Sequence, residues 1–244
     1  ELHILQTKVL RELSLHQTRR FSDMMSVTEL TSDDFKFHLR KLVKLGLVLK
    51  NIDGVYELTA RGKELANRFD YDDQAPIRQP KLTTIVFLKR HNPTTGEIEY
   101  LFQQRLRQPF FHYWGAIGEP IRWGEAFETA AARGLLEQTG LVSQLSFKGF
   151  YRQRDKLEGS QEILEDKLFV IFVANHSGDR LKDWPFASNQ WADADWLKSQ
   201  PQHFDSCSAI LTILEDDISF SEGITTYSTG IYYFSPFSII TLPL

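Results

Sequence analysis

Apolar residues recur at helical spacing in three segments near the start of the chain. A first helix is expected over residues 5–15, followed by a short apolar segment at 21–25. A third helix is expected to begin at residues 31–34, whose hydroxyls and carboxylates can accept hydrogen bonds from its free N–H groups. The apolar stripe of this helix contains Phe35, Leu39, Leu42, Val43 and Leu47. This spacing predicts one buried face.

The pattern then changes from helical to alternating. Short apolar segments at 47–49 and 55–58 are separated by Asp53 and Gly54, a pair that tolerates the positive φ angles of tight hairpin turns. A further helix is expected over residues 60–69. Three helices, a hairpin and a helix are the element order of a winged helix, in which the third helix enters the major groove of DNA and the hairpin forms the wing.

Residues 71–80 are polar, contain two prolines and lack periodicity, so they are expected to form a linker. Beyond them, strands are expected at 82–88 and 97–104, a helix at 127–137, a buried strand at 168–174 and a last helix around 209–214. The final segment, 218–244, is rich in Ser, Thr, Tyr and Phe and is expected to be β-like, with no function assigned. The predicted division is therefore a domain at 1–70, a linker at 71–80, a second domain at 81–217 and a tail at 218–244.

Composition and charge narrow the functional classes. The chain has 244 residues, of which 42% are hydrophobic and 25% charged, as in ordinary globular proteins. A single cysteine, Cys207, excludes an intramolecular disulfide and favours a reducing compartment. No apolar run is long enough to span a membrane, and no secretion signal is evident, so we expect a cytoplasmic protein without a membrane partner. The net charge of −4 is unevenly distributed, because the first 69 residues are net basic and the remainder net acidic.

The basic excess permits an interface with double-stranded DNA, and the winged-helix element order favours one. The predicted DNA-binding side chains lie on the third helix and the wing: Lys36, His38, Arg40, Lys41, Lys44 and Lys50. Long cationic side chains pair with phosphates and give salt-dependent binding. The alternatives are a solvated face, or a winged helix that binds protein or only dimerises. The segment Val55–Leu65 resembles an element of bacterial winged-helix regulators that joins the wing to the last helix. Tyr56, Leu58, Thr59 and Gly62 match that element.

Residues 115–142 carry a second motif. They read GAIGEPIRWGEAFETAAARGLLEQTGLV and resemble the Nudix box, G-x5-E-x7-R-E-U-x-E-E-x-G-U, where U is apolar. The resemblance implies a Nudix-like α/β/α sandwich with a mixed sheet, so that the whole chain is of the α+β class with an α-rich winged helix at its N-terminus. In such a motif, carboxylates on one helical face hold divalent cations that bridge a substrate pyrophosphate and activate water.

The match preserves the register of the box but not all its carboxylates. Glu125, Arg133, Leu135, Glu137, Gly140 and Leu141 fit the pattern. The resemblance implies that Glu125 and Arg133 form a structural pair and that Glu137 is the catalytic carboxylate if the protein is active. Three positions depart, because the first glycine is Glu119, the glutamate after the arginine is Gly134, and the second paired glutamate is Gln138. Gly134 offers no ligand, and Gln138 offers an uncharged amide oxygen.

The metal expected in this family is Mg²⁺, and the candidate ligands are Glu137, Gln138 and Glu165. Loss of two carboxylates should weaken binding of a hard dication. Other acidic residues, including Glu119, Glu162 and Asp166, could compensate or could be loop carboxylates in water. The candidates for binding a phosphorylated ligand are Arg105, Arg107, Arg122 and Trp123, because guanidinium groups pair with phosphate oxygens and an indole can stack on a base.

These features favour a transcription regulator that resembles Nudix-related regulators. The winged helix would bind DNA, and the Nudix domain would sense a nucleoside-diphosphate-linked or other phosphorylated metabolite. A homodimer is expected, since two winged helices can then contact two half-sites. The alternative is a divergent Mg²⁺-dependent Nudix hydrolase of a nucleoside diphosphate derivative, with the winged helix as an accessory module. A third possibility is a protein-interaction module with neither activity.

Overall fold

The computed structural model describes residues 2–26, 28, 30–68, 78–176, 178, 181–182, 184–216 and 219–227. The chain divides into two compact units, the first ending at Arg78 and the second beginning at Gln79. Most of the predicted linker, residues 71–77, lies outside the described residues. No helix in the described part of the chain is long and apolar enough to cross a membrane.

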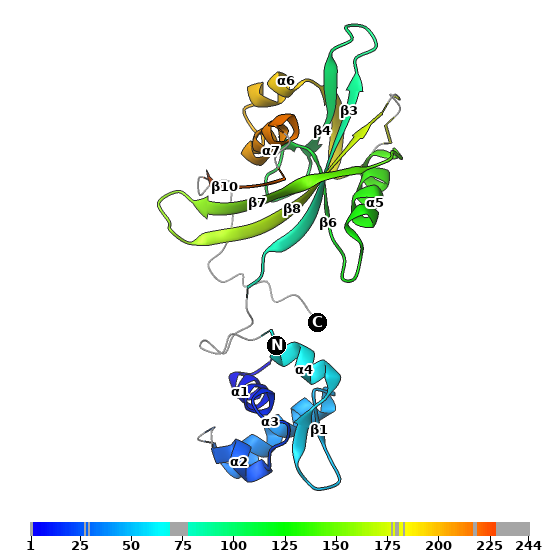
Figure 1. Cartoon of the computed structure of the whole chain (residues 1–244). Helices are drawn as coiled ribbons and strands as arrows, with labels where there is room; N and C mark the ends of the chain where they lie inside the picture. Colours follow the sequence, from blue (N-terminus) through cyan, green and yellow to red (C-terminus); the bar gives the residue numbers. More distant parts are fainter. Residues whose placement is uncertain are drawn as a thin grey trace. The chain divides into compact units, whose positions relative to one another are not determined.

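The first unit has the element order expected from its apolar pattern (Figure 1). Its elements are α1 (Ile4–Ser14), α2 (Phe21–Ser26), α3 (Ser32–Lys44), β1 (Val48–Lys50), β2 (Tyr56–Leu58) and α4 (Ala60–Ala66). Thr31 caps α3 by accepting a hydrogen bond from the N–H of Asp34. Val9, Leu10, Phe35 and Leu42 are among the side chains of a single buried core. Four α-helices and an antiparallel hairpin therefore enclose one hydrophobic core.

One residue of the predicted stripe on α3 is not buried as expected. Phe35, Leu39, Leu42 and Leu47 lie in the core, whereas the side chain of Val43 is 39% exposed. Val43 sits at the edge of the apolar face, and there it lines an open groove beside the β1–β2 hairpin. The prediction of a fully buried stripe is thus wrong at this position, because spacing alone does not fix where the covered face ends.

Gly62 explains the match to the wing-to-helix element. Thr59 caps α4 by accepting a hydrogen bond from the N–H of Gly62 at 3.0 Å, and its hydroxyl donates to the carbonyl oxygen of Gly46 at 2.7 Å. A Cβ atom on Gly62 would lie only 1.9 Å from the carbonyl oxygen of Leu47. Glycine at position 62 therefore lets α4 pack directly against the backbone that enters the hairpin.

The second unit contains an eight-stranded mixed sheet. The strands are β3 (Lys81–His91), β4 (Ile98–Arg105), β5 (Trp114–Gly115), β6 (Ile117–Pro120), β7 (Ser146–Leu157), β8 (Ile163–Asn175), β9 (Ala187–Ala192) and β10 (Phe220–Tyr227). The main order is β10-β7-β8-β3-β4-β5, with β6 paired to β3 and β9 paired to β4. The β3–β8 and β7–β10 pairs are parallel, whereas the other pairs are antiparallel.

Helices cover both faces of this sheet (Figure 1). They are α5 (Phe127–Thr139) on one face, and α6 (Ala194–Ser199) and α7 (Asp205–Asp216) on the other. Alternate residues of β3 enter two different cores: Ile85 and Phe87 face the α6–α7 side, whereas Val86 and Leu88 face α5. A strand buried on both faces reads as the continuous apolar run seen in the sequence. The predicted α/β/α sandwich with a mixed sheet is confirmed.

Several observed elements are longer than predicted, and others were not predicted. The predicted strand at 168–174 is the second half of β8, and the predicted last helix at 209–214 lies within α7. Strand β7 was not expected, because more than half of its residues are charged or polar and its few apolar residues do not alternate with them as in a buried strand. The first part of the predicted β-like tail forms β10, which pairs with β7, and residues 228–244 lie outside the described residues.

We predict that Gly62→Ala destabilises the first unit by roughly 3 kcal/mol, because the methyl group collides with backbone that cannot move without disturbing the hairpin. Hydrogen exchange within α3 and α4 measures this loss, since the second unit does not contribute to it. Lys63→Ala is the matched control on the same helix, because the side chain of Lys63 is exposed. Equal protection in both variants would contradict the packing role of Gly62.

Candidate functional site

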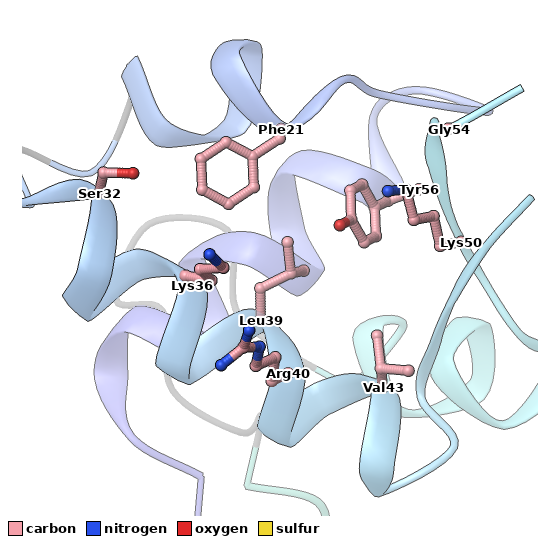
Figure 2. Close-up of a pocket in the computed structure, with 9 residues that line it drawn as sticks. All are labelled: Phe21, Ser32, Lys36, Leu39, Arg40, Val43, Lys50, Gly54 and Tyr56. Carbon is pink, nitrogen blue, oxygen red and sulfur yellow. The ribbon is translucent and has the colours of Figure 1, made fainter.

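The first unit has a basic groove between α2, α3 and the hairpin (Figure 2). Its volume is about 570 Å³, and its walls come from three consecutive parts of the chain. Residues of α3 form one wall, Lys50, Gly54 and Tyr56 of the hairpin form another, and Phe21 of α2 lies at the end. The ammonium of Lys50 lies 5.6 Å from the ring centre of Tyr56. The groove is thus lined both by positively charged groups and by apolar side chains.

The predicted DNA-binding residues do not all lie at this groove. Lys36, Arg40 and Lys50 line it, whereas Lys41 and Lys44 are exposed side chains of α3 outside its lining. His38 faces α1, where its ring lies 4.5 Å from that of His3. Burial lowers the pKa of His38 below its usual value of 6.5, with a further contribution from His3. The structure therefore groups three of the six residues, and His38 carries no positive charge at neutral pH.

The second unit holds the box motif as strand, loop and helix. Strand β6 leads into the loop 121–126, which leads into α5, and Gly140 ends the helix in the left-handed conformation with φ of 76°. The guanidinium of Arg133 bonds both oxygens of Glu125, with Nε to Oε1 at 2.8 Å and Nη2 to Oε2 at 2.9 Å. It also donates to the carbonyl oxygen of Pro120 at 3.0 Å and to the carboxylate of Glu119. One side chain thereby joins the strand, the loop and the helix.

This network is largely shielded from water. The side chains of Arg133 and Glu125 are 13% and 11% exposed. Hydrogen bonds from Arg133, and from the backbone N–H of Arg122, lower the pKa of Glu125 to about 2. Hydrogen bonds to Glu125 and Glu119 raise the pKa of Arg133. The pair is therefore fully charged across the physiological pH range, and it fixes the conformation of the loop.

The family assignment follows from comparison of the sequence with family models. The model of the NUDIX domain matches residues 80–206, which is more than half of the 244 residues. The chain belongs to the Nudix family. No curated protein sequence matches the chain.

Solved structures share the fold of this Nudix domain. The NUDIX domain of Shewanella oneidensis NrtR, complexed with ADP ribose, has a TM-score of 0.50 and 21% identity, covering 65% of this chain and 99% of that chain. The whole Shewanella oneidensis NrtR has a TM-score of 0.44 and 21% identity, covering 55% of this chain and 62% of that one. The mutator MutT protein of Bacillus halodurans has a TM-score of 0.48 and 19% identity, covering 62% of this chain and 93% of that chain. At these identities the likeness concerns the fold alone.

The predicted ligand-binding residues occupy different surroundings in the Nudix domain. Arg122 and Trp123 lie in the loop of the box, where the side chain of Arg122 is 67% exposed and that of Trp123 is 89% exposed. Arg105, at the end of β4, donates to the carbonyl oxygen of Pro109 at 2.6 Å and so helps to hold its own loop. The guanidinium of Arg107 lies 5.6 Å from the ring centre of Trp184. Arg122 and Trp123 are thus neighbours in the loop that Arg133 organises.

The candidate metal ligands are not gathered around one point. Glu137 is half exposed and faces two cations, with its oxygens 4.0 Å from Nη2 of Arg122 and 3.9 Å from Nη1 of Arg133. Glu165 pairs instead with Lys81 and Lys167, at 2.7 and 2.6 Å. Among the described residues, no three His, Cys, Asp or Glu side chains are close enough together to hold a metal ion.

The residues of the box do not fit a Mg²⁺ ion in this arrangement. Gly134 has no side chain, and Gln138 directs its amide nitrogen to the carboxylate of Glu119 at 2.8 Å. The carbonyl oxygen of the Gln138 side chain is buried without a hydrogen-bond partner. Mg²⁺ requires oxygen ligands in near-octahedral geometry, and the remaining carboxylate, Glu137, is already beside two guanidinium groups.

Sequence reasoning underestimated one residue and missed two others. Glu119 was considered as a compensating metal ligand or as a loop carboxylate in water, yet it contacts both Arg133 and Gln138. Phe21 and Tyr56 line the basic groove, but neither was considered as part of the DNA-binding surface. The departure of Glu119 from the box pattern was the available signal for its role. No local signal indicated that Phe21 would meet the hairpin, because that contact depends on packing.

We predict that Glu125→Gln destabilises the Nudix domain at neutral pH and has little effect near pH 2. The pKa of Glu125 is lowered from 4.5 to about 2, so the stabilisation that its charge provides is present above about pH 4.5 and is lost as the pH falls towards 2. Urea unfolding of both proteins over this range measures the difference in midpoint. Glu128→Gln, an exposed position in the first turn of α5, is the control and should show no such trend. A difference that is independent of pH would contradict the role of the carboxylate charge.

Proposed function

We propose that this protein is a transcription regulator with two binding functions. The first unit is a winged helix that binds double-stranded DNA, and the Nudix domain senses a nucleoside-diphosphate-linked or other phosphorylated metabolite. The observation that carries the proposal is the state of the box. Its structural pair, Glu125 and Arg133, is intact, while two of the three helix positions that would hold a catalytic metal are a glycine and an amide, and only Glu137 keeps a carboxylate. Such a site keeps the ion pair that holds the loop, but it lacks the carboxylates that would bind a metal ion for efficient hydrolysis.

The basic groove supports the DNA-binding part of the proposal. Lys36 and Arg40 extend from the helix that would enter the major groove, and Lys50 extends from the wing. Cations on both elements can neutralise neighbouring phosphates of one DNA backbone, which gives affinity without specifying sequence. We further propose that the protein acts as a homodimer, because two copies of the winged helix would then contact two half-sites.

The loop of the box supports the ligand-binding part. Arg133 and Glu125 hold this loop, and the exposed side chains of Arg122 and Trp123 project from it. A guanidinium can pair with diphosphate oxygens, and an indole can stack on a nucleobase. The NrtR domain that shares this fold is complexed with ADP ribose, so ADP-ribose is the first ligand to test.

The second candidate function is a divergent Nudix hydrolase. It is favoured by one observation, namely that Glu137 keeps a half-exposed carboxylate on the helix of the box. Cleavage of the pyrophosphate bond of ADP-ribose, nucleotide sugars and dinucleotides in the presence of Mg²⁺, followed as formation of the nucleotide product, distinguishes the two functions. Turnover by the wild type that is lost in Glu137→Gln would show that the protein is an enzyme and would contradict the sensor function.

For DNA binding, we predict that replacing Lys36, Arg40 and Lys50 together with alanine weakens binding to a mixed-sequence duplex. The slope of log K against log salt should fall by about 3, because each phosphate contact contributes about 0.9. Fluorescence anisotropy at several salt concentrations measures both quantities. The control replaces three exposed lysines of the Nudix domain, Lys148, Lys182 and Lys198, with alanine. If the slope falls equally in the control variant, the groove makes no specific contribution to DNA binding.

For ligand binding, we predict that ADP-ribose raises the melting temperature of the Nudix domain. Arg122→Ala and Trp123→Ala should each weaken binding by about tenfold, since each removes one charged or stacking contact. Isothermal titration calorimetry measures the affinity. Val142→Ala removes a comparably exposed apolar side chain outside the loop and should leave binding unchanged. Wild-type affinity in both loop variants would exclude this loop as the binding surface.

A further inference from the structure

Glu119 and Gly134 have exchanged residue types relative to the box pattern. The pattern has glycine at position 119 and glutamate at position 134, whereas this chain has the reverse. The two positions face each other in the structure. A Cβ atom on Gly134 would lie 2.5 Å from Cβ and 2.9 Å from Cγ of Glu119, closer than real side chains approach. The space between β6 and α5 therefore accommodates one side chain from these two positions, and here it comes from the strand.

The carboxylate of Glu119, which extends from β6, accepts hydrogen bonds from other side chains of the protein. One oxygen of Glu119 pairs with Nη1 of Arg133, and the other accepts a hydrogen bond from Nε2 of Gln138 at 2.8 Å. The same nitrogen donates to the carbonyl oxygen of Gly118 at 3.0 Å. The side chain of Glu119 is 17% exposed, and Gln138 is buried. Both oxygens of this carboxylate are thus used inside the protein.

The third departure from the box follows from the first. A glutamate at position 138 would place a second carboxylate within hydrogen-bond distance of Glu119, in a largely buried position. Two carboxylates in contact repel each other, and burial increases the cost of their charges. Glutamine provides a donor of the same shape instead. Glu119, Gly134 and Gln138 are therefore mutually dependent, since the strand carboxylate requires a glycine on one side and an amide on the other.

We propose that these three departures are one coupled exchange, which converts the metal site of a Nudix helix into an internal, metal-independent network. The carboxylate at position 119 balances the charge of Arg133 and orients Gln138, and it does not hold a divalent cation. The box consequently keeps its shape when no metal is present. This inference concerns the box itself and holds for any ligand that the domain binds.

Reversal of the exchange tests the proposal with metal alone. The triple variant Glu119→Gly/Gly134→Glu/Gln138→Glu restores the carboxylates of the pattern, and we expect it to bind Mn²⁺ at least about tenfold more tightly than the wild type does. The electron paramagnetic resonance signal of free Mn²⁺, titrated with the full-length chain, measures this affinity, and circular dichroism verifies that the variant is folded. A folded triple variant that binds Mn²⁺ no better than the wild type overturns the proposal. The proposal is also overturned if the wild type binds Mn²⁺ and Glu119→Gln abolishes that binding, because Glu119 would then be a metal ligand.

A second measurement tests the steric coupling without metal. Alanine favours helix over glycine, so helix propensity alone predicts that Gly134→Ala raises the melting temperature. The proposal predicts instead that Gly134→Ala lowers the melting temperature when it is introduced into the wild type or into a Glu119→Ala variant, because Cβ of residue 119 remains in both. In a Glu119→Gly background the obstructing atom is absent, and Gly134→Ala should raise the melting temperature. A rise in all three backgrounds would show that the two positions are independent, and the exchange would be refuted.

Discussion

The guanidinium of Arg133 connects three segments of the Nudix domain that would otherwise be free to separate. It bonds the carboxylate of Glu125 in the loop, the carbonyl oxygen of Pro120 at the end of β6, and the carboxylate of Glu119. A planar group with five donors can satisfy several acceptors at fixed angles, which a lysine could not do. Because the loop between β6 and α5 is held in this way, the positions of Arg122 and Trp123 depend on the pairing of Arg133 with Glu125.

The same interaction explains how the box keeps its shape while its chemistry changes. In the box pattern, the helix would supply carboxylates for a metal ion, and the arginine would brace the loop. Here a strand carboxylate meets that arginine, and the helix offers a glycine and an amide where charges would be. The loop and the helix remain in register, although the helix lacks two of the carboxylates that the pattern would supply for a metal ion. The conformation of the loop therefore does not depend on those two carboxylates.

The basic groove of the first unit depends on a different constraint. Its cations come from a helix and a hairpin that follow each other closely in the chain, and α4 packs on the backbone at Leu47, where the hairpin begins. Gly62 permits that close approach, and Thr59 caps α4 at the same point. The close packing of α4 therefore supports the backbone that leads into the strand carrying Lys50. His38 lies on another face of α3, beside His3, and does not line the groove.

The sequence by itself determined the features that repeat within one element or one short motif. The apolar periodicity gave the helices of the first unit, and the spacing of Glu125, Arg133, Glu137 and Gly140 identified the Nudix box, because these relations lie along a single helix and its adjoining loop. Strand β7 escaped prediction, since its burial comes from neighbours on both sides rather than from an apolar composition. Only the tertiary structure decided that Glu119 fills the space of Gly134 and that three cations share one groove. Those contacts join separate secondary-structure elements, and local periodicity specifies which face of an element is buried but not which side chains of a neighbouring element it contacts.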